Sequence, residues 1–135
     1  MKEARVAERD HLEESLHYLM INVLVDSLES EGFTVAADHV GGRREQPAPI
    51  GDFIPDIQAK RGEEIHLIEV ETQSTLASPR FHDQLARLAA QAGVHAYVAV
   101  PFDCIEKVRR LREALNLRVG IMPCYPFVGY IGTSK

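Results

Sequence analysis

The alternation of apolar and polar residues predicts three amphipathic helices. Over residues 6–31, apolar side chains recur every three or four positions and a glycine follows, as on one face of a helix that ends there. The apolar positions of this segment are Leu12, Leu16, Leu19, Met20, Val23, Leu24 and Leu28. The same spacing appears over residues 78–91 and 102–115, and the former begins with Ser78 as a candidate cap and Pro79 at the first helical position.

Shorter runs rich in β-branched and aromatic residues predict β-strands. They cover residues 33–37, 53–60, 64–73 and 94–100, with one or two further strands over 117–122 and 127–131. Between the second and third runs, the residues around Gly62 form a compact turn that indicates a hairpin. The expected order is α-β-β-β-α-β-α-β. It predicts an α/β fold in which helices flank a mixed β-sheet, since a β-α-β passage is parallel and directly connected strands pair antiparallel.

Composition places residues 1–135 in one globular domain. The chain has 135 residues, of which 45% are hydrophobic and 26% charged, and this length is sufficient to bury a core. No apolar run is long enough to span a membrane, and the charged N-terminus does not resemble a secretion signal. Cys104 and Cys124 match no zinc-binding spacing and are expected to be reduced. These features predict a cytoplasmic protein that has no membrane partner.

Three carboxylates are expected to meet on one face of the predicted hairpin. Side chains alternate along a strand, so Glu69, Glu71 and Gln73 share one face, while Val70 takes the other. Across the hairpin, Asp56 falls nearly opposite Glu69. Neighbouring carboxylates repel, and in a covered sheet they are costly unless a cation is bound among them. The pattern therefore favours a site for a hard divalent cation such as Mg²⁺.

Two other interpretations of the acidic hairpin remain open from the residues alone. In one, the hairpin is an exposed edge whose acids are solvated; in the other, the acids pair with arginines. The arginines in question are Arg43 and Arg44, in the loop 41–52, and Arg80, at the start of the second helix. The same three arginines are candidate contacts for phosphate groups of a substrate.

The residues Pro55-Asp56, followed thirteen positions after Asp56 by Glu69-Val70-Glu71, resemble the signature of the PD-(D/E)xK restriction-endonuclease-like superfamily. The small Holliday junction resolvases are similar in size and element order. The resemblance implies a metal-dependent DNA endonuclease that uses Mg²⁺ or Mn²⁺ and leaves a 5′-phosphate and a 3′-hydroxyl. It also implies that Asp56, Glu69 and the main-chain carbonyl of Val70 bind the metal.

The chain departs from this family at one position, because Glu71 stands where the family carries lysine. Glu71 is a candidate ligand of a second ion or a candidate general base, and Gln73 is a candidate to hold water or a phosphate oxygen. Related nucleases often place a glutamate of the first helix near the metal. Glu13, at the margin of the apolar face of that helix, is the candidate here.

Together these features predict a metal-dependent DNA endonuclease, structure-selective as resolvases are and acting as a homodimer, since two-fold DNA favours a two-fold protein. The net charge of −5 does not suit a protein that coats nucleic acid through phosphate contacts alone. The alternative is a non-catalytic binding or assembly module of the same fold, with a vestigial acidic site. A third interpretation is an α/β protein that binds a small ligand or a protein partner.

Overall fold

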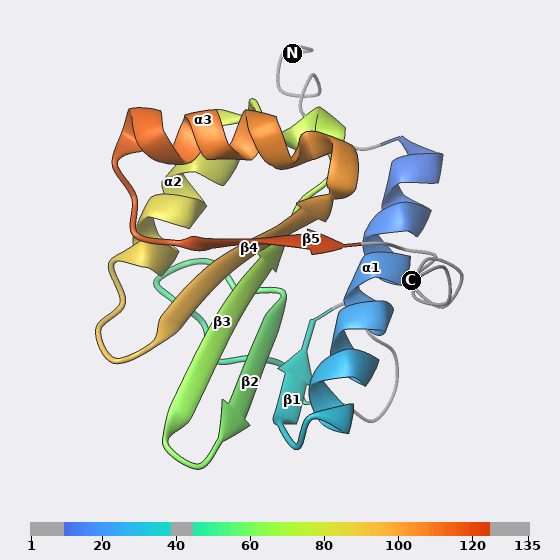
Figure 1. Cartoon of the computed structure of the whole chain (residues 1–135), viewed down its shortest axis with the longest axis vertical. Coiled ribbons are helices and arrows are strands. Elements are labelled where there is room, and N and C mark those ends of the chain that lie inside the picture. The colour runs from blue at the N-terminus through green and yellow to red at the C-terminus, as the bar shows by residue number, and fades with distance from the viewer. Residues whose placement is uncertain (1–9, 39–44, 125–135) are drawn as a thin grey trace.

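A five-stranded mixed sheet forms the centre of the protein in the computed structural model, which describes residues 10–38 and 45–124 (Figure 1). The pairs β1–β2 and β2–β3 are antiparallel, whereas β3–β4 and β4–β5 are parallel. The strands lie side by side in chain order and are β1 (Thr34–Ala37), β2 (Ile57–Arg61), β3 (Glu64–Val70), β4 (His95–Pro101) and β5 (Gly120–Cys124). The predicted α/β class with a mixed sheet is therefore confirmed.

Helices cover both faces of this sheet. Helix α1 (His11–Ser30) packs on one face, and helices α2 (Pro79–Ala89) and α3 (Ile105–Leu115) pack on the other (Figure 1). Each parallel pair of strands is joined through a helix, α2 between β3 and β4 and α3 between β4 and β5. Two 3₁₀ turns that the pattern did not predict, η2 (Gln73–Thr75) and η3 (Phe102–Cys104), precede these helices. Within the described ranges, no helix is long and apolar enough to cross a membrane.

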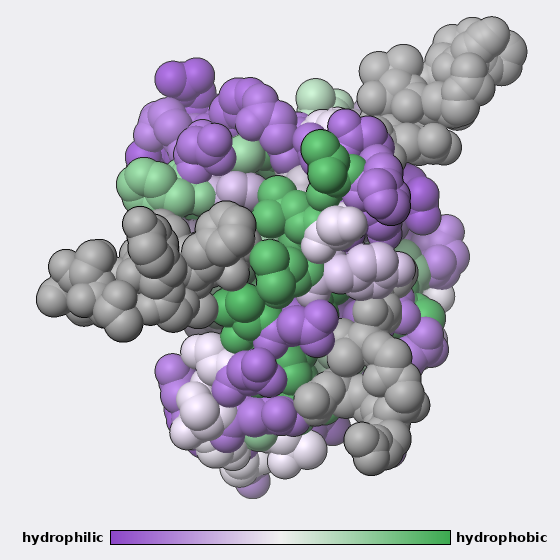
Figure 2. Space-filling view, turned by 90° about the vertical axis from the view of Figure 1, so that its right-hand side faces the viewer, coloured by the Kyte–Doolittle hydropathy of each residue, from purple (hydrophilic) through white to green (hydrophobic). Residues whose placement is uncertain are grey.

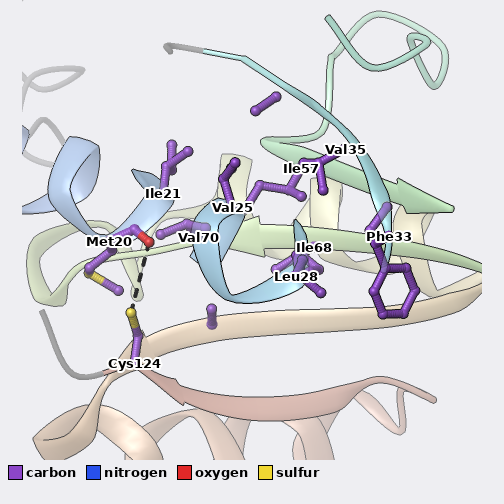
Figure 3. Packing of buried hydrophobic residues seen from close by; sticks show 13 residues of the cluster. Met20, Ile21, Val25, Leu28, Phe33, Val35, Ile57, Ile68, Val70 and Cys124 are labelled. Carbon is purple, nitrogen blue, oxygen red and sulfur yellow. Dashed lines mark hydrogen bonds between the residues drawn. The ribbon is translucent and has the colours of Figure 1, made fainter. Parts of the chain in front are cut away.

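The core beneath α1 is built from alternate side chains of the strands. Met20 and Val25 of α1 lie over Ile68 and Val70 of β3, and these four side chains are at most 1% exposed (Figure 3). Strand β5 reaches the same layer, where the Cys124 thiol donates to the main-chain oxygen of Met20 over 4.0 Å. This layer joins the first helix to the far edge of the sheet.

A second core fills the space between the sheet and helices α2 and α3. Its buried residues include Leu67, Phe81, Leu85, Leu88, Val98, Val100 and Val108. Leu67 and Ile68 are neighbours on β3 but belong to opposite cores, because side chains alternate along a strand. Strand β3 is thus covered on both faces, and any polar side chain near its end is taken out of water.

A tight turn determines the register of the hairpin formed by β2 and β3. Gly62 takes φ +61°, a left-handed conformation that glycine adopts without the steric cost of a side chain. In the resulting register, Ile57 of β2 pairs with Ile68 of β3. Asp56 directly precedes Ile57 and therefore lies against Glu69, as the sequence predicted.

Both strands of this hairpin are shorter than the pattern predicts. Strand β2 begins at Ile57 instead of residue 53, because Pro55 has no N–H to donate to the strand ladder. Strand β3 ends at Val70 instead of residue 73, where the chain turns into η2. The strand expected over residues 127–131 lies outside the described residues.

Side chains cap the starts of α1 and α2, and the cap at Ser78 was predicted. The Ser78 side chain accepts from the main-chain N–H groups of Arg80 and Phe81, and Pro79 occupies the first turn of α2. Asp10 precedes α1 and caps it, since its side chain accepts from the main-chain N–H of Glu13 at 2.8 Å.

The apolar stripe of α1 is wider than its contact with the sheet. Met20 and Leu28 are buried, but Leu12 is 77% exposed and Leu19 is 39% exposed. Figure 2 shows apolar side chains at the surface in the middle of the face on which α1 lies. Leu12 sits in the first turn of the helix, and Leu19 is rotated by about 100° from Met20 around the helix axis. Spacing alone therefore overestimated how much of the stripe is core.

The packing of α1 can be tested by replacing a buried and an exposed leucine of this helix with alanine. Leu28→Ala should lower the free energy of unfolding by about 2–4 kcal/mol, because it leaves a cavity in the core. Leu12→Ala, in the exposed first turn, should change it by less than about 0.5 kcal/mol. Urea unfolding followed by circular dichroism measures both. Equal losses for the two variants would contradict the observed placement of α1.

Candidate metal centre

Three carboxylates meet where the hairpin of β2 and β3 approaches η2. Asp56 precedes β2, Glu69 lies in β3, and Glu71 follows β3. One oxygen of each lies within 4.8 Å of an oxygen of both others. The three residues are only 7%, 5% and 6% exposed. The structure thus brings together the acids that the strand pattern placed on one face, and it buries them.

Two hydrogen bonds between side chain and main chain hold Asp56 and Glu69 in place. The Val70 N–H donates to Asp56 Oδ2 at 2.7 Å, and the Asp56 N–H donates to Glu69 Oε1 at 3.0 Å. Because Pro55 interrupts the strand ladder, carboxylate oxygens replace main-chain carbonyls as the acceptors here. The backbone of β3 therefore orients the Asp56 carboxylate, and the backbone of Asp56 orients the Glu69 carboxylate.

The electrostatics of this carboxylate group favour a bound cation. The pKa of Glu69 lies well above its ordinary value, chiefly because burial removes water from the carboxylate, and further because Asp56 and Glu71 add negative charge. A divalent cation among the oxygens would offset all three effects. The donor set consists of hard oxygen ligands, so the residues fit Mg²⁺ or Mn²⁺ better than a soft transition metal.

The short turn η2 connects this group to the first helix. Thr75 Oγ1 donates to Glu71 Oε1, and Ser74 donates to Glu13 Oε1 through its hydroxyl at 2.6 Å and its N–H at 3.2 Å. Glu13 therefore lies at the same end of the sheet, although it is not one of the three clustered carboxylates. Glu13 is a residue that the sequence predicted for the site, whereas Ser74 and Thr75, which hold the two glutamates, were not predicted.

His17 of α1 also belongs to this site and was missed by the sequence analysis. Its Nε2 lies 3.5 Å from Asp56 Oδ2, and its side chain is 4% exposed. On a helix, residues four apart lie on the same face, so Glu13 and His17 both reach this end of the sheet. A glutamate and a histidine with this spacing at the margin of an apolar face are the signal that would have indicated the residue.

Gln73 does not continue the strand face of the carboxylates. It begins η2, is exposed, and its Oε1 accepts from the Cys104 thiol at 3.4 Å. The prediction that Gln73 lies in the same strand face is wrong, because β3 ends three residues earlier. Its side chain lies beside the site, at the start of the turn that holds Glu71.

The three predicted arginine contacts have different outcomes. Arg80 is exposed in the first turn of α2. Its charge contributes to lowering the pKa of Asp52, although the main cause of that shift is the bond between Asp52 and Arg87. Arg43 and Arg44 lie outside the described residues.

Comparisons with known proteins add no relative to this description. Neither a protein-family model, nor a curated protein, nor a solved structure matches the chain. The fold and the carboxylate group are therefore the basis for assigning a function.

The raised pKa of Glu69 predicts that this residue lowers the free energy of unfolding of the metal-free protein as pH rises. As pH rises, the unfolded state releases the Glu69 proton before the folded state does, so this group makes stability fall. Glu69→Gln should therefore raise the free energy of unfolding at pH 8 by about 1–3 kcal/mol. The gain should vanish toward pH 4. Urea unfolding in EDTA from pH 4 to 8 measures it, with Glu106→Gln on the exposed face of α3 as control. A gain that is independent of pH would contradict the assignment.

Proposed function

We propose that this protein is a metal-dependent DNA endonuclease of the PD-(D/E)xK type. The observation that carries the proposal is the buried group of Asp56, Glu69 and Glu71 at the end of a hairpin in a mixed α/β sheet. Mg²⁺ in proteins is typically held by one or two carboxylates together with substrate phosphates. The spacing of Pro55, Asp56 and Glu69 supports a restriction-endonuclease-like fold, although Glu71 stands where that family carries lysine.

In this proposal, Asp56 and Glu69 hold the ion together with the main-chain carbonyl of Val70. Their orientation is already determined by the two hydrogen bonds between β3 and the residue before β2. His17, 3.5 Å from Asp56 Oδ2, limits how the Asp56 carboxylate can rotate. When bound there, Mg²⁺ would supply a positive charge that polarises the scissile phosphate and makes the attacking water more acidic.

Glu71 is the proposed general base. Thr75 donates to one of its oxygens, which orients the buried carboxylate within the site. The water oxygen attacks phosphorus while its proton passes to Glu71. The bond from phosphorus to the 3′ oxygen breaks, and that oxygen takes up a proton to leave a 3′-hydroxyl opposite a 5′-phosphate. Glu13 of α1, which is bound to Ser74 of η2, and Gln73 are the candidates to hold water beside the reacting phosphate.

The charge of the protein restricts how DNA is bound. With a net charge of −5, the chain has no excess of lysine and arginine to bind DNA phosphates in the absence of a metal. Arg43, Arg44 and Arg80 are the proposed phosphate contacts. We propose that the protein acts as a homodimer on branched or duplex DNA, since one small domain offers little surface to hold a duplex.

Cleavage should depend on both metal and carboxylates. We expect Mg²⁺ or Mn²⁺ to support cleavage of a DNA panel that contains linear duplex, single strand, flap and four-way junction. Glu69→Gln should reduce the rate by roughly 10³-fold, because the metal contributes several kcal/mol to transition-state stabilisation. Glu106→Gln, which removes an exposed acid of α3, is the matched control and should cleave normally. Gel analysis of labelled ends gives rates and the end chemistry. Equal rates for both variants would contradict the proposal.

Metal binding separates the nuclease from a non-catalytic module. Mg²⁺ at about 100 times its dissociation constant should stabilise wild type by about 2.7 kcal/mol. Glu69→Gln should lose most of this stabilisation, whereas Glu106→Gln should keep it. Thermal unfolding with and without Mg²⁺ measures the effect. Stabilisation without cleavage of any DNA would favour the alternative of a binding or assembly module. An absence of stabilisation would contradict the metal site itself.

A further inference from the structure

A second group of metal-ligating side chains lies at the start of β3, far from the carboxylate group. It consists of Glu64 and His66 of β3 and His95 of β4, and one donor atom of each lies within 4.8 Å of a donor atom of both others. We propose that this group binds a divalent transition-metal ion such as Zn²⁺. The proposal does not depend on the nuclease assignment.

The strand register places these donors together. His66 and His95 are direct partners in the parallel pair of β3 and β4, and their ring centroids are 5.1 Å apart. Glu64 precedes His66 by two residues and therefore projects from the same face. Three ligand side chains thus come from two neighbouring strands, whose backbone is held by hydrogen bonds.

The donor distances already approach those around a single ion. His66 Nε2 lies 3.1 Å from Glu64 Oε2. In a tetrahedral zinc site with bonds of about 2.0–2.2 Å, two ligand atoms lie about 3.3–3.5 Å apart. The pair therefore needs only a small movement to share an ion. His95 is exposed, so its ring can turn toward the ion at low cost.

Neighbouring side chains restrict Glu64 and His66 before any ion binds. Arg61 donates to Glu64 Oε1 at 3.2 Å and to the main-chain oxygen of Glu31 at 2.9 Å. The carboxylate is thereby held so that its other oxygen faces His66. The His66 ring packs near the rings of Phe33 and Tyr97, with centroid distances of 5.0 Å and 5.2 Å. Such outer contacts orient metal ligands and raise affinity.

The chemistry of this group differs from that of the carboxylate group. Two imidazoles and one carboxylate suit Zn²⁺, and three protein ligands leave a fourth position open for water or a substrate. Three carboxylates suit Mg²⁺. His66 and Glu69 project from opposite faces of β3 and are three residues apart, about 10 Å along the strand. One chain therefore offers two sites that select different ions.

The test is a Zn²⁺ titration by calorimetry in the Glu69→Gln background with excess Mg²⁺, so that the carboxylate group takes no zinc. We expect one Zn²⁺ per chain. Adding His95→Ala, an exposed position that should not affect folding, should weaken binding by at least tenfold. Adding His11→Ala, which removes an exposed histidine of α1, should leave it unchanged. Circular dichroism confirms that each variant is folded.

Co²⁺ provides a second readout, because an ion with four ligands of this kind absorbs strongly in the visible range. The absorption should appear with His11→Ala and disappear with His95→Ala and with Glu64→Gln. No saturable Zn²⁺ binding would overturn the proposal. Binding that His95→Ala leaves unchanged would also overturn it, since the ion would then be held elsewhere on the chain.

Discussion

The interaction on which the site depends is the exchange of hydrogen bonds between Asp56 and the end of β3. Asp56 accepts from Val70 and donates to Glu69, at 2.7 Å and 3.0 Å. These bonds satisfy the backbone where Pro55 ends the ladder between the strands. They also bring two carboxylates together in a buried position, which a regular ladder would not require. The hydrogen bonds that replace the strand ladder at Pro55 are therefore also the bonds that bring Asp56 and Glu69 together.

The helices around the sheet bury these carboxylates, which makes their negative charges energetically unfavourable. Strand β3 is covered by α1 on one face and by α2 and α3 on the other, which removes water from its carboxylates. Helix α1 also brings His17 and Glu13 to the same place, and η2 holds Glu13 and Glu71 through Ser74 and Thr75. The elements that bury the acids are thus the elements that position their neighbours.

Local pattern was sufficient to predict the order of the helices and strands and the approach of Asp56 to Glu69, because these follow from periodicity and from a short turn at Gly62. It was not sufficient for Gln73, because the end of β3 depends on where η2 packs. It also failed for His17: the spacing of Glu13 and His17 on α1 is a local signal, but the partner, Asp56, lies 39 positions away along the chain. The group of Glu64, His66 and His95 was missed for a similar reason: the histidines belong to different strands, and only the parallel register brings them together.

The glutamate at position 71 determines what the site requires. A lysine there would attract the other two acids, whereas Glu71 repels them, and at 4 Å each such interaction is of the order of 4 kcal/mol at an effective dielectric constant of 20. A domain with roughly 5–15 kcal/mol of stability cannot carry this repulsion unrelieved. Burial, and then the charges of Asp56 and Glu71, raise the pKa of Glu69 and so favour a proton on its carboxyl group. Because a metal ion must displace that proton, ion binding and deprotonation are linked. The negative charge that Glu71 adds would thus be offset by the proposed ion.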